Sequence, residues 1–126
     1  PRGTGDDVAP AGLIAHFMSF AWRLGAVCSD PDMRRLAGTF TRCLYRGDGR
    51  FRGRLDPDST TEKYASAVAR WTFLAQFDPL VEEQFLEFAA VQVESGSDGV
   101  NPTLGTLAWG YLTRARNLRD SGLARK

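Results

Sequence analysis

The segment STTEKYASAVARWTFLAQFDPLVEEQFLEFAAVQVE, residues 59–94, decides the fold of this chain. Its apolar residues recur three and four positions apart, which is the spacing that places side chains on one face of a helix. Asp78-Pro79 interrupts this pattern, because proline has no backbone N–H to donate and suits the first turn of a new helix. The segment therefore predicts two helices that meet at a sharp corner.

The first of these two helices begins at a predicted capping box, Ser59-x-x-Glu62, whose side chains bind free backbone N–H groups. Three further helices are expected, from Val8 to Val27, from Asp30 to Arg46 and from Pro102 to Asp120. Aspartate or asparagine before proline starts a helix, and the chain has four such pairs: Asp30-Pro31, Asp56-Pro57, Asp78-Pro79 and Asn101-Pro102. The most N-terminal helix is apolar around most of its circumference, so we expect it to be the most central one.

Residues 46–55, RGDGRFRGRL, do not fit a helix, because three glycines in seven residues lower the helix propensity. Two structures are compatible with this stretch. One is a mobile basic loop, which we favour. The other is a short hairpin in which Leu44-Tyr45 pairs with residues 51–55 across Gly47-Asp48-Gly49.

Together these elements predict an all-α fold. We expect a compact bundle of about five helices with short corners that start at the Asx-Pro pairs, and one loop rich in glycine and arginine. At 126 residues one domain is the natural number. We place it at residues 8–120, with flexible termini at residues 1–7 and 121–126.

The composition of the chain restricts where the protein is expected to be located and which class of partner it is expected to bind. The net charge is +1, but fourteen of the sixteen basic residues are arginine, which makes forked contacts with phosphate or carboxylate. A GC-rich genome would produce the same bias. The chain shows neither a signal-peptide pattern nor an apolar run of membrane-spanning length, so we expect an intracellular protein without a membrane contact. Cys28 and Cys43 fall on apolar positions, which favours two buried free thiols over a disulfide.

The residues do not favour an enzyme. His16 is the single histidine, and neither cysteine lies near it in sequence, so a nucleophile–base pair has few candidates. No spacing of histidine, cysteine and carboxylates matches a metal site. The glycine-rich stretch matches neither the phosphate-binding loop nor the dinucleotide fingerprint. We expect no metal and no cofactor.

The remaining functional signal is a run of seven arginines within residues 34–54, interleaved with Tyr45 and Phe51. Arginine for phosphate contacts and an aromatic ring for base stacking are the combination that single-stranded nucleic acids favour. We therefore predict a non-enzymatic helical module that binds nucleic-acid backbone, within an assembly of the coat or nucleocapsid kind. The predicted binding residues are Arg35, Arg42, Arg46, Arg50, Phe51, Arg52 and Arg54.

An alternative function is purely protein–protein interaction, as a self-assembling structural or adaptor subunit. The same arginines would then contact an acidic protein partner or a second copy of the chain. Glu83, Glu87 and Glu94 lie on one side of the helix that follows Pro79. If they pair with Arg35, Arg42 and Arg46 in the same chain, the arginine face has a structural role only.

Two short resemblances point in different directions. Asp78-Pro79-Leu80-Val81, followed by Asn101-Pro102-Thr103, resembles a fragment of the coat proteins of the tobacco mosaic virus type. Residues 59–88 are similar in rhythm to the helical arm-binding region of tyrosine recombinases, although the catalytic residues of those enzymes are absent. The two resemblances imply incompatible folds, so neither assigns the chain to a family.

Overall fold

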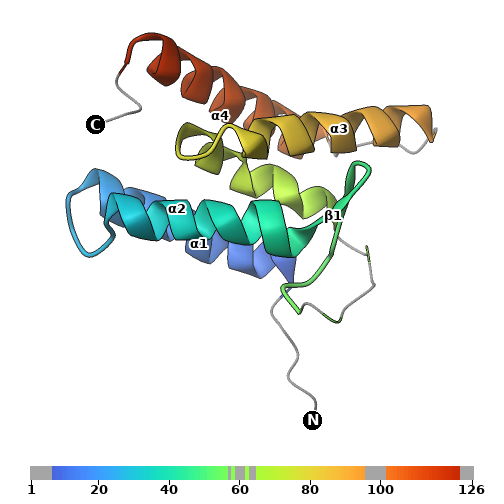
Figure 1. The fold of residues 1–126 in the computed structure, drawn as a ribbon, viewed down its shortest axis with the longest axis horizontal. Helices are drawn as coiled ribbons and strands as arrows, with labels where there is room; N and C mark the ends of the chain where they lie inside the picture. Colours follow the sequence, from blue (N-terminus) through green and yellow to red (C-terminus); the bar gives the residue numbers. More distant parts are fainter. Residues whose placement is uncertain (1–6, 57, 59–61, 63–64, 96–101, 123–126) are drawn as a thin grey trace.

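The computed structural model describes residues 7–56, 58, 62, 65–95 and 102–122. Its elements are α1 (Val8–Arg23), α2 (Asp30–Gly38), η1 (Thr39–Leu44), β1 (Tyr45–Gly47), β2 (Arg50–Phe51), η2 (Ala65–Gln76), α3 (Leu80–Glu94) and α4 (Pro102–Asp120). η1 is a π-helical continuation of α2, and η2 is a 3-10 helix. In Figure 1, α1 and α2 lie on one side of η2, and α3 and α4 lie on the other.

The central element is η2, and not the N-terminal helix that we expected in that place. η2 contacts all four α-helices, and its side chains are buried on every side, with Trp71, Leu74 and Val68 among the most deeply buried. A 3-10 helix of this length is uncommon. Its four alanines keep it narrow and let the surrounding helices approach closely: Ala65, Ala67, Ala69 and Ala75.

α1 packs on η2 through small residues, and this contact corrects the prediction that α1 is central. Ala11, Gly12 and Ala15 are buried, and a Cβ atom added to Gly12 would lie only 3.0 Å from Trp71 Nε1. The same indole nitrogen donates a hydrogen bond to the Val8 carbonyl oxygen at 3.1 Å. The small side of α1 therefore faces the core, while its large apolar side chains point away from it.

α2 begins at Asp30, as predicted, but its N-cap is Ser29, one residue before the predicted cap Asp30. Ser29 caps it through a capping box with Asp32, while Asp30 accepts a hydrogen bond from the Trp22 indole. The wider turn of η1 then buries Phe40, Thr41 and Leu44. Cys43 is consequently exposed, so its predicted burial is wrong. Both cysteines are free thiols, and Cys28 is half-buried against the core.

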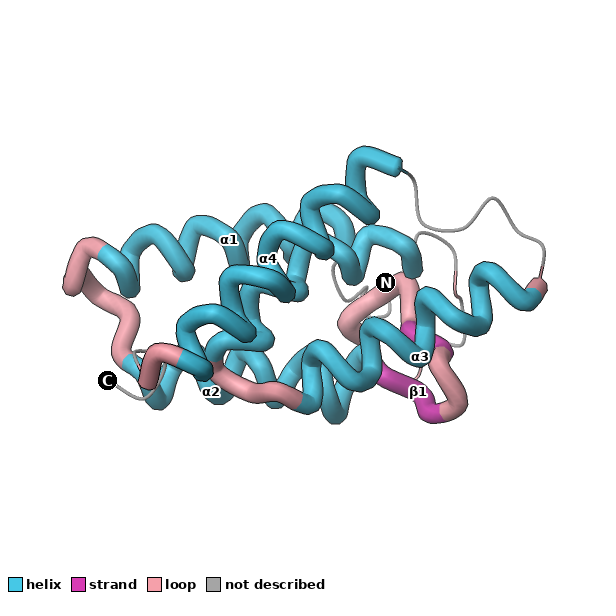
Figure 2. Tube along the Cα trace, turned by 90° about the horizontal axis from the view of Figure 1, so that it is seen from above, coloured by secondary structure: helices cyan, strands magenta, loops and turns pink. Residues whose placement is uncertain are grey.

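A hairpin replaces the basic loop that we favoured. β1 and β2 pair antiparallel, with Tyr45 opposite Phe51 and Gly47 opposite Arg50. The two central residues, Asp48 and Gly49, have positive φ angles of 53° and 70°, which is the combination that a two-residue type I′ turn requires. A Cβ atom on Gly49 would lie 2.7 Å from the Glu87 carbonyl oxygen, and Figure 2 shows the two strands beside α3.

The corner at Asp78-Pro79 is confirmed. The Asp78 carboxylate accepts a hydrogen bond from Leu80 N–H at 2.9 Å, and α3 and α4 span the predicted ranges.

α1 ends at Arg23, four residues before the predicted end. Ser59 of the predicted capping box, Pro57 and Asn101 lie outside the described residues, as do residues 1–6 and 123–126 of the predicted flexible termini. Asp7 does not belong to a flexible arm, because it pairs with Arg54.

The described part of the chain is therefore predominantly helical, with five helical segments and one two-stranded sheet. The helical prediction is confirmed at this level, and the prediction of a purely α-helical fold is wrong because of the hairpin. None of the helices in the described ranges combines the length and the apolar character that a membrane span requires.

Candidate interaction surface

The arginines of the hairpin, which the sequence assigned to ligand binding, are engaged within the chain. Arg46 and Arg50 both pair with the Glu62 carboxylate, each at 2.9 Å. Arg52 donates a hydrogen bond from Nε to the Cys43 carbonyl oxygen at 3.0 Å, and so satisfies a carbonyl near the end of η1. Arg54 lies 3.4 Å from Asp7, at the start of α1. These arginines hold the hairpin against its neighbours.

Phe51 is not available for base stacking, and this part of the predicted site is corrected. Its residue surface is only 1% exposed. Its ring packs against Phe40, Tyr45 and Phe88, with ring centroids 4.9, 5.3 and 5.5 Å away. The alternation of exposed Arg50 with buried Phe51 is what a strand with one buried face produces.

The arginines of α2 and η1 lie in a different environment. Arg34, Arg35 and Arg42 are exposed. Arg35 contacts Asp32 one turn earlier on the same helix, and the Arg42 side chain lies back across Gly38. Among the contacts of the described residues, neither Arg35 nor Arg42 pairs with a carboxylate of α3.

The acidic side of α3 has other neighbours. Glu87 accepts a hydrogen bond from the Tyr45 hydroxyl, and this bond raises the pKa of Tyr45. Glu83 and Glu94 are exposed. The pairing between this acidic side and the arginine face, which the sequence left open, is therefore absent for Arg35 and Arg42 in the part of the chain that is described.

Glu82, in the first turn of α3, is the buried glutamate of that helix, whereas its other glutamates are exposed. The Glu82 side chain is 10% exposed and binds both Arg116 and Arg119 of α4, the latter at 2.7 Å. Burial by itself would raise the pKa of Glu82, but the hydrogen bonds and charges of the two arginines outweigh it and lower that pKa. This cluster joins α3 to α4.

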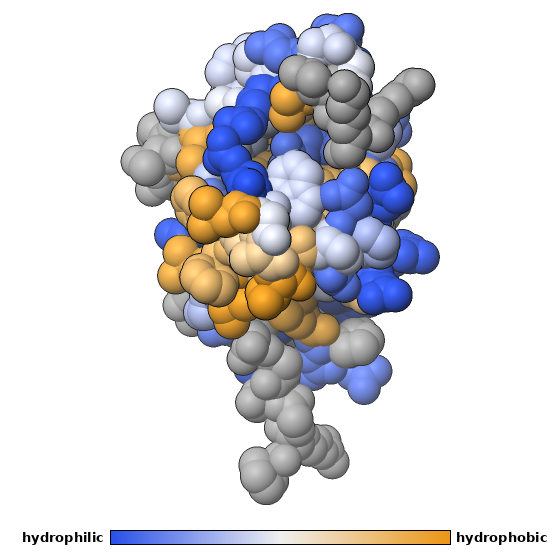
Figure 3. Space-filling model, turned by 90° about the vertical axis from the view of Figure 1, so that its left-hand side faces the viewer, coloured by the Kyte–Doolittle hydropathy of each residue, from blue (hydrophilic) through white to orange (hydrophobic). Residues whose placement is uncertain are grey.

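In the part of the chain that the structure describes, most of the exposed large apolar side chains belong to α1 and the loop that follows it. Six large apolar residues there are between 54% and 87% exposed: Leu13, Ile14, Phe17, Phe20, Leu24 and Val27. An exposed set of this kind marks an interaction site far more often than a chance arrangement of surface residues. Seen from the end where α1 turns toward α2, apolar surface gathers on one side of the molecule and hydrophilic surface on the other (Figure 3).

Four of these side chains form a narrow stripe, which we call the α1 seam: Leu13, Phe17, Phe20 and Leu24. Their spacing of four, three and four residues is that of the contact positions in a pair of packed helices. Within α1 the only charged residue is Arg23, in the last turn, so no charge interrupts the seam.

Sequence reasoning missed this surface because it counted apolar residues without weighing their size. The positions that face η2 carry small residues such as Ala11, Gly12, Ala15 and Ser19, and the positions of the α1 seam carry Leu and Phe. A helix with small residues on one side and large residues on the other has two surfaces that can contact a neighbour. The small-residue side of α1 packs on η2, and this contact leaves the large-residue side exposed. The signal for this surface in the sequence was that small and large apolar residues occupy different sides of α1.

His16 lies half-buried on a third side of α1, beside a pocket of about 50 Å³ between α1, η2 and α4. Its ring stacks on Phe73 with a centroid distance of 5.4 Å, and its Nε2 atom is hydrogen-bonded to the Tyr111 hydroxyl. Burial lowers the pKa of His16 and raises the pKa of Tyr111. Within the described ranges no group of histidine, cysteine and carboxylate side chains is arranged to hold a metal ion.

Comparison of the chain with models of protein families, with curated proteins and with solved structures gave no significant match.

Proposed function

We propose that the chain is a self-assembling subunit whose α1 seam packs against the α1 seam of a second copy. The observation that carries this proposal is the exposure of the six large apolar side chains of α1 and its following loop. Their exposed area is on the order of 700 Å², close to the roughly 800 Å² that each partner buries in a stable interface.

The order of residues in the α1 seam supports a second copy as the occupant. Leu-x3-Phe-x2-Phe-x3-Leu reads the same in both directions. In an antiparallel pair with a two-fold axis midway between Phe17 and Phe20, each Leu13 faces Leu24 of the other copy, and each Phe17 faces Phe20. A two-fold interface requires this reciprocity, and the nearly uncharged helix provides no like-charge repulsion.

Sedimentation velocity over a wide range of protein concentration tests the proposal. We expect a reversible monomer–dimer equilibrium. Phe17→Asp places a charge at the centre of the seam and should weaken dimerisation by about a hundredfold or more, because central aromatic residues dominate interface energies. Val93→Asp is the matched control, since Val93 is 76% exposed on α3, outside the seam.

A monomer at every concentration, or equal dimerisation of wild type and Phe17→Asp, would show that the seam is not a dimer interface. If the chain stayed monomeric but bound lipid vesicles through the same residues, the occupant of the seam would be a membrane surface, and the proposal would be wrong.

Disulfide trapping tests the antiparallel register. In a background with Cys28→Ala and Cys43→Ser, a mixture of Leu13→Cys and Leu24→Cys chains should oxidise to the mixed dimer. Each variant alone should not, because the two seam ends are eleven residues apart in sequence, or roughly 16 Å along a helix. Efficient trapping of Leu13→Cys with itself would indicate a parallel pair instead.

A second candidate function, binding of nucleic-acid backbone, is favoured by one observation. Arg34, Arg35 and Arg42 are exposed, and no carboxylate of α3 pairs with Arg35 or Arg42 within the described residues. Titration of single-stranded RNA and DNA at several salt concentrations tests it, because phosphate contacts release counterions. Replacement of the three arginines by glutamine should abolish salt-dependent binding, whereas Arg50→Gln should not. Absence of binding at low salt rejects this function.

A further inference from the structure

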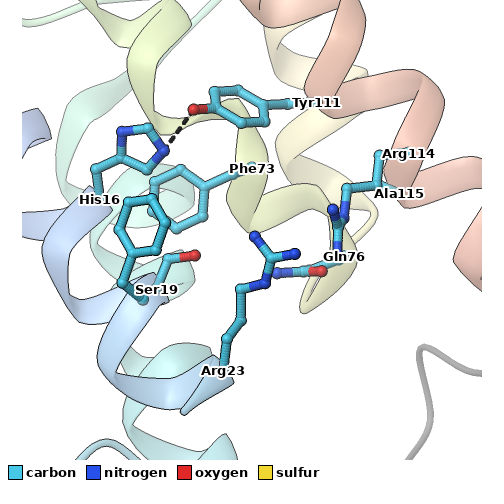
Figure 4. A pocket seen from close by; sticks show the side chains of 9 residues that line it. His16, Ser19, Arg23, Phe73, Gln76, Tyr111, Arg114 and Ala115 are labelled. Atoms are coloured by element: carbon cyan, nitrogen blue, oxygen red, sulfur yellow. Dashed lines mark hydrogen bonds between the residues drawn. The ribbon is translucent and has the colours of Figure 1, made fainter.

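The pocket beside His16 is formed by three elements that are distant in sequence. α1 contributes Ser19 and Arg23, η2 contributes Gln76, and α4 contributes Tyr111 and Arg114 (Figure 4). The rings of Phe20 and Phe73 form much of its apolar lining. This arrangement brings cationic, neutral polar and aromatic groups to one small space that is open to solvent.

Four of the polar side chains of this pocket are free to bind a ligand. Within the described residues, the side chains of Ser19, Gln76, Arg23 and Arg114 take part in no hydrogen bond or ion pair. Ser19 is nevertheless buried, so its hydroxyl group has only the pocket to face. Together these residues offer two guanidinium groups, one hydroxyl donor and one amide donor.

The charge of the pocket is uncompensated. Arg23 and Arg114 line it from two different helices, and none of the described residues that line it is aspartate or glutamate. Two cations that share a small site repel each other, and in a folded protein such repulsion is relieved by an anion.

We propose that this pocket binds the phosphate group of a small ligand. The two arginines match the charge of a phosphate dianion, and arginine forms paired hydrogen bonds with its oxygens. Ser19 and Gln76 supply neutral donors for the remaining oxygen positions. A volume of about 50 Å³ is far below the roughly 300 Å³ that encloses a whole drug-sized ligand, so the pocket holds one group and leaves the rest of the ligand outside.

This inference is separate from the proposed dimerisation. Phe20 borders both the pocket and the α1 seam, but the arginines that bind the anion are not seam residues. Substitution of Arg23 or Arg114 therefore tests anion binding without removing the apolar contacts of the seam, and Phe17→Asp tests the seam without removing a group of the pocket.

Thermal unfolding with inorganic phosphate as the probe tests the proposal, with acetate as the second arm and ionic strength held constant with chloride. Phosphate should raise the melting temperature of the wild type by an amount that saturates with concentration. Arg23→Gln and Arg114→Gln should each weaken phosphate binding about tenfold or more, measured by isothermal titration calorimetry. Arg34→Gln is the matched control, because Arg34 is an exposed arginine of α2 outside the pocket.

Phosphate also stabilises proteins by exclusion from their surface, so the readout is the difference between wild type and pocket variants. Without added anion, Arg23→Gln should melt at the same temperature as the wild type or slightly above it, because it removes one of two like charges. An equal response of wild type and both pocket variants to phosphate would overturn the proposal. Saturable binding of acetate but not of phosphate would also overturn it, and would assign the pocket to carboxylates.

Discussion

At Gly12, α1 packs closely against η2. A Cβ atom there would lie 3.0 Å from Trp71 Nε1 and 3.3 Å from Arg70 Cβ. Trp71 cannot move aside easily, because it is 1% exposed and its indole is hydrogen-bonded to Val8. We therefore predict that Gly12→Ala destabilises the protein by about 1–2 kcal/mol despite the better helix propensity of alanine. Urea denaturation measures this change, and a stabilised variant would show that the two helices can separate.

Glu82 is a buried carboxylate whose ionisation affects the stability of the fold. Its pKa in the folded chain is lowered because the hydrogen bonds and charges of Arg116 and Arg119 outweigh the effect of burial. A carboxyl group with a lowered folded-state pKa contributes stability above its unfolded pKa, and this contribution is lost as the pH falls through the folded one. We predict a loss of stability that begins as the pH drops below about 4.3, the ordinary pKa of glutamate.

The test of this prediction is the pH dependence of the free energy of unfolding. Glu82→Gln should destabilise the protein at neutral pH by about 1–2 kcal/mol and should remove part of the acid sensitivity. Glu83→Gln is the control, since Glu83 is exposed on the same turn of α3. Identical acid profiles for wild type and Glu82→Gln would exclude a role for this cluster.

At the scale of the element, α4 contains two glycines with no packing role. A Cβ atom at Gly105 or Gly110 would meet no atom within 4 Å. Gly110 is also exposed in the middle of the helix. We predict that Gly110→Ala stabilises the protein by about 1 kcal/mol, which raises the melting temperature by about 4 °C for a domain of this size. Destabilisation would contradict the open space around Gly110.

The hairpin was recognisable in part from its sequence. Asp48-Gly49 is a strong signal for a two-residue turn, and the stretch also holds Gly47, whose φ angle of 96° is accessible chiefly to glycine. What the local pattern did not contain was the surface on which the strands rest. Tyr45 binds Glu87, and Gly49 lies against the backbone of α3, and these contacts order a stretch that would form a mobile loop in isolation.

At the scale of the whole molecule, the proposed dimer makes thermal stability depend on concentration. Association stabilises the folded chain by mass action, so the apparent melting temperature of the wild type should rise with protein concentration. Because the α1 seam is apolar, high salt should not dissociate the dimer, whereas an assembly held by charges would be weakened by screening. A melting temperature independent of concentration, or a dimer that dissociates in high salt, would contradict association through the seam.

The sequence by itself determined the predominantly helical class, the corner at Asp78-Pro79 and the limits of α3 and α4. These features depend on capping, on proline and on helical periodicity, all of which act within a few residues of the chain. Only the tertiary structure decided which side of α1 faces the core, which carboxylates the arginines contact, and that residues 45–51 form strands. Burial and ion pairing depend on the shape and charge of elements distant in sequence, and Trp71 of η2 accepts the small side of α1 and leaves its large side chains exposed.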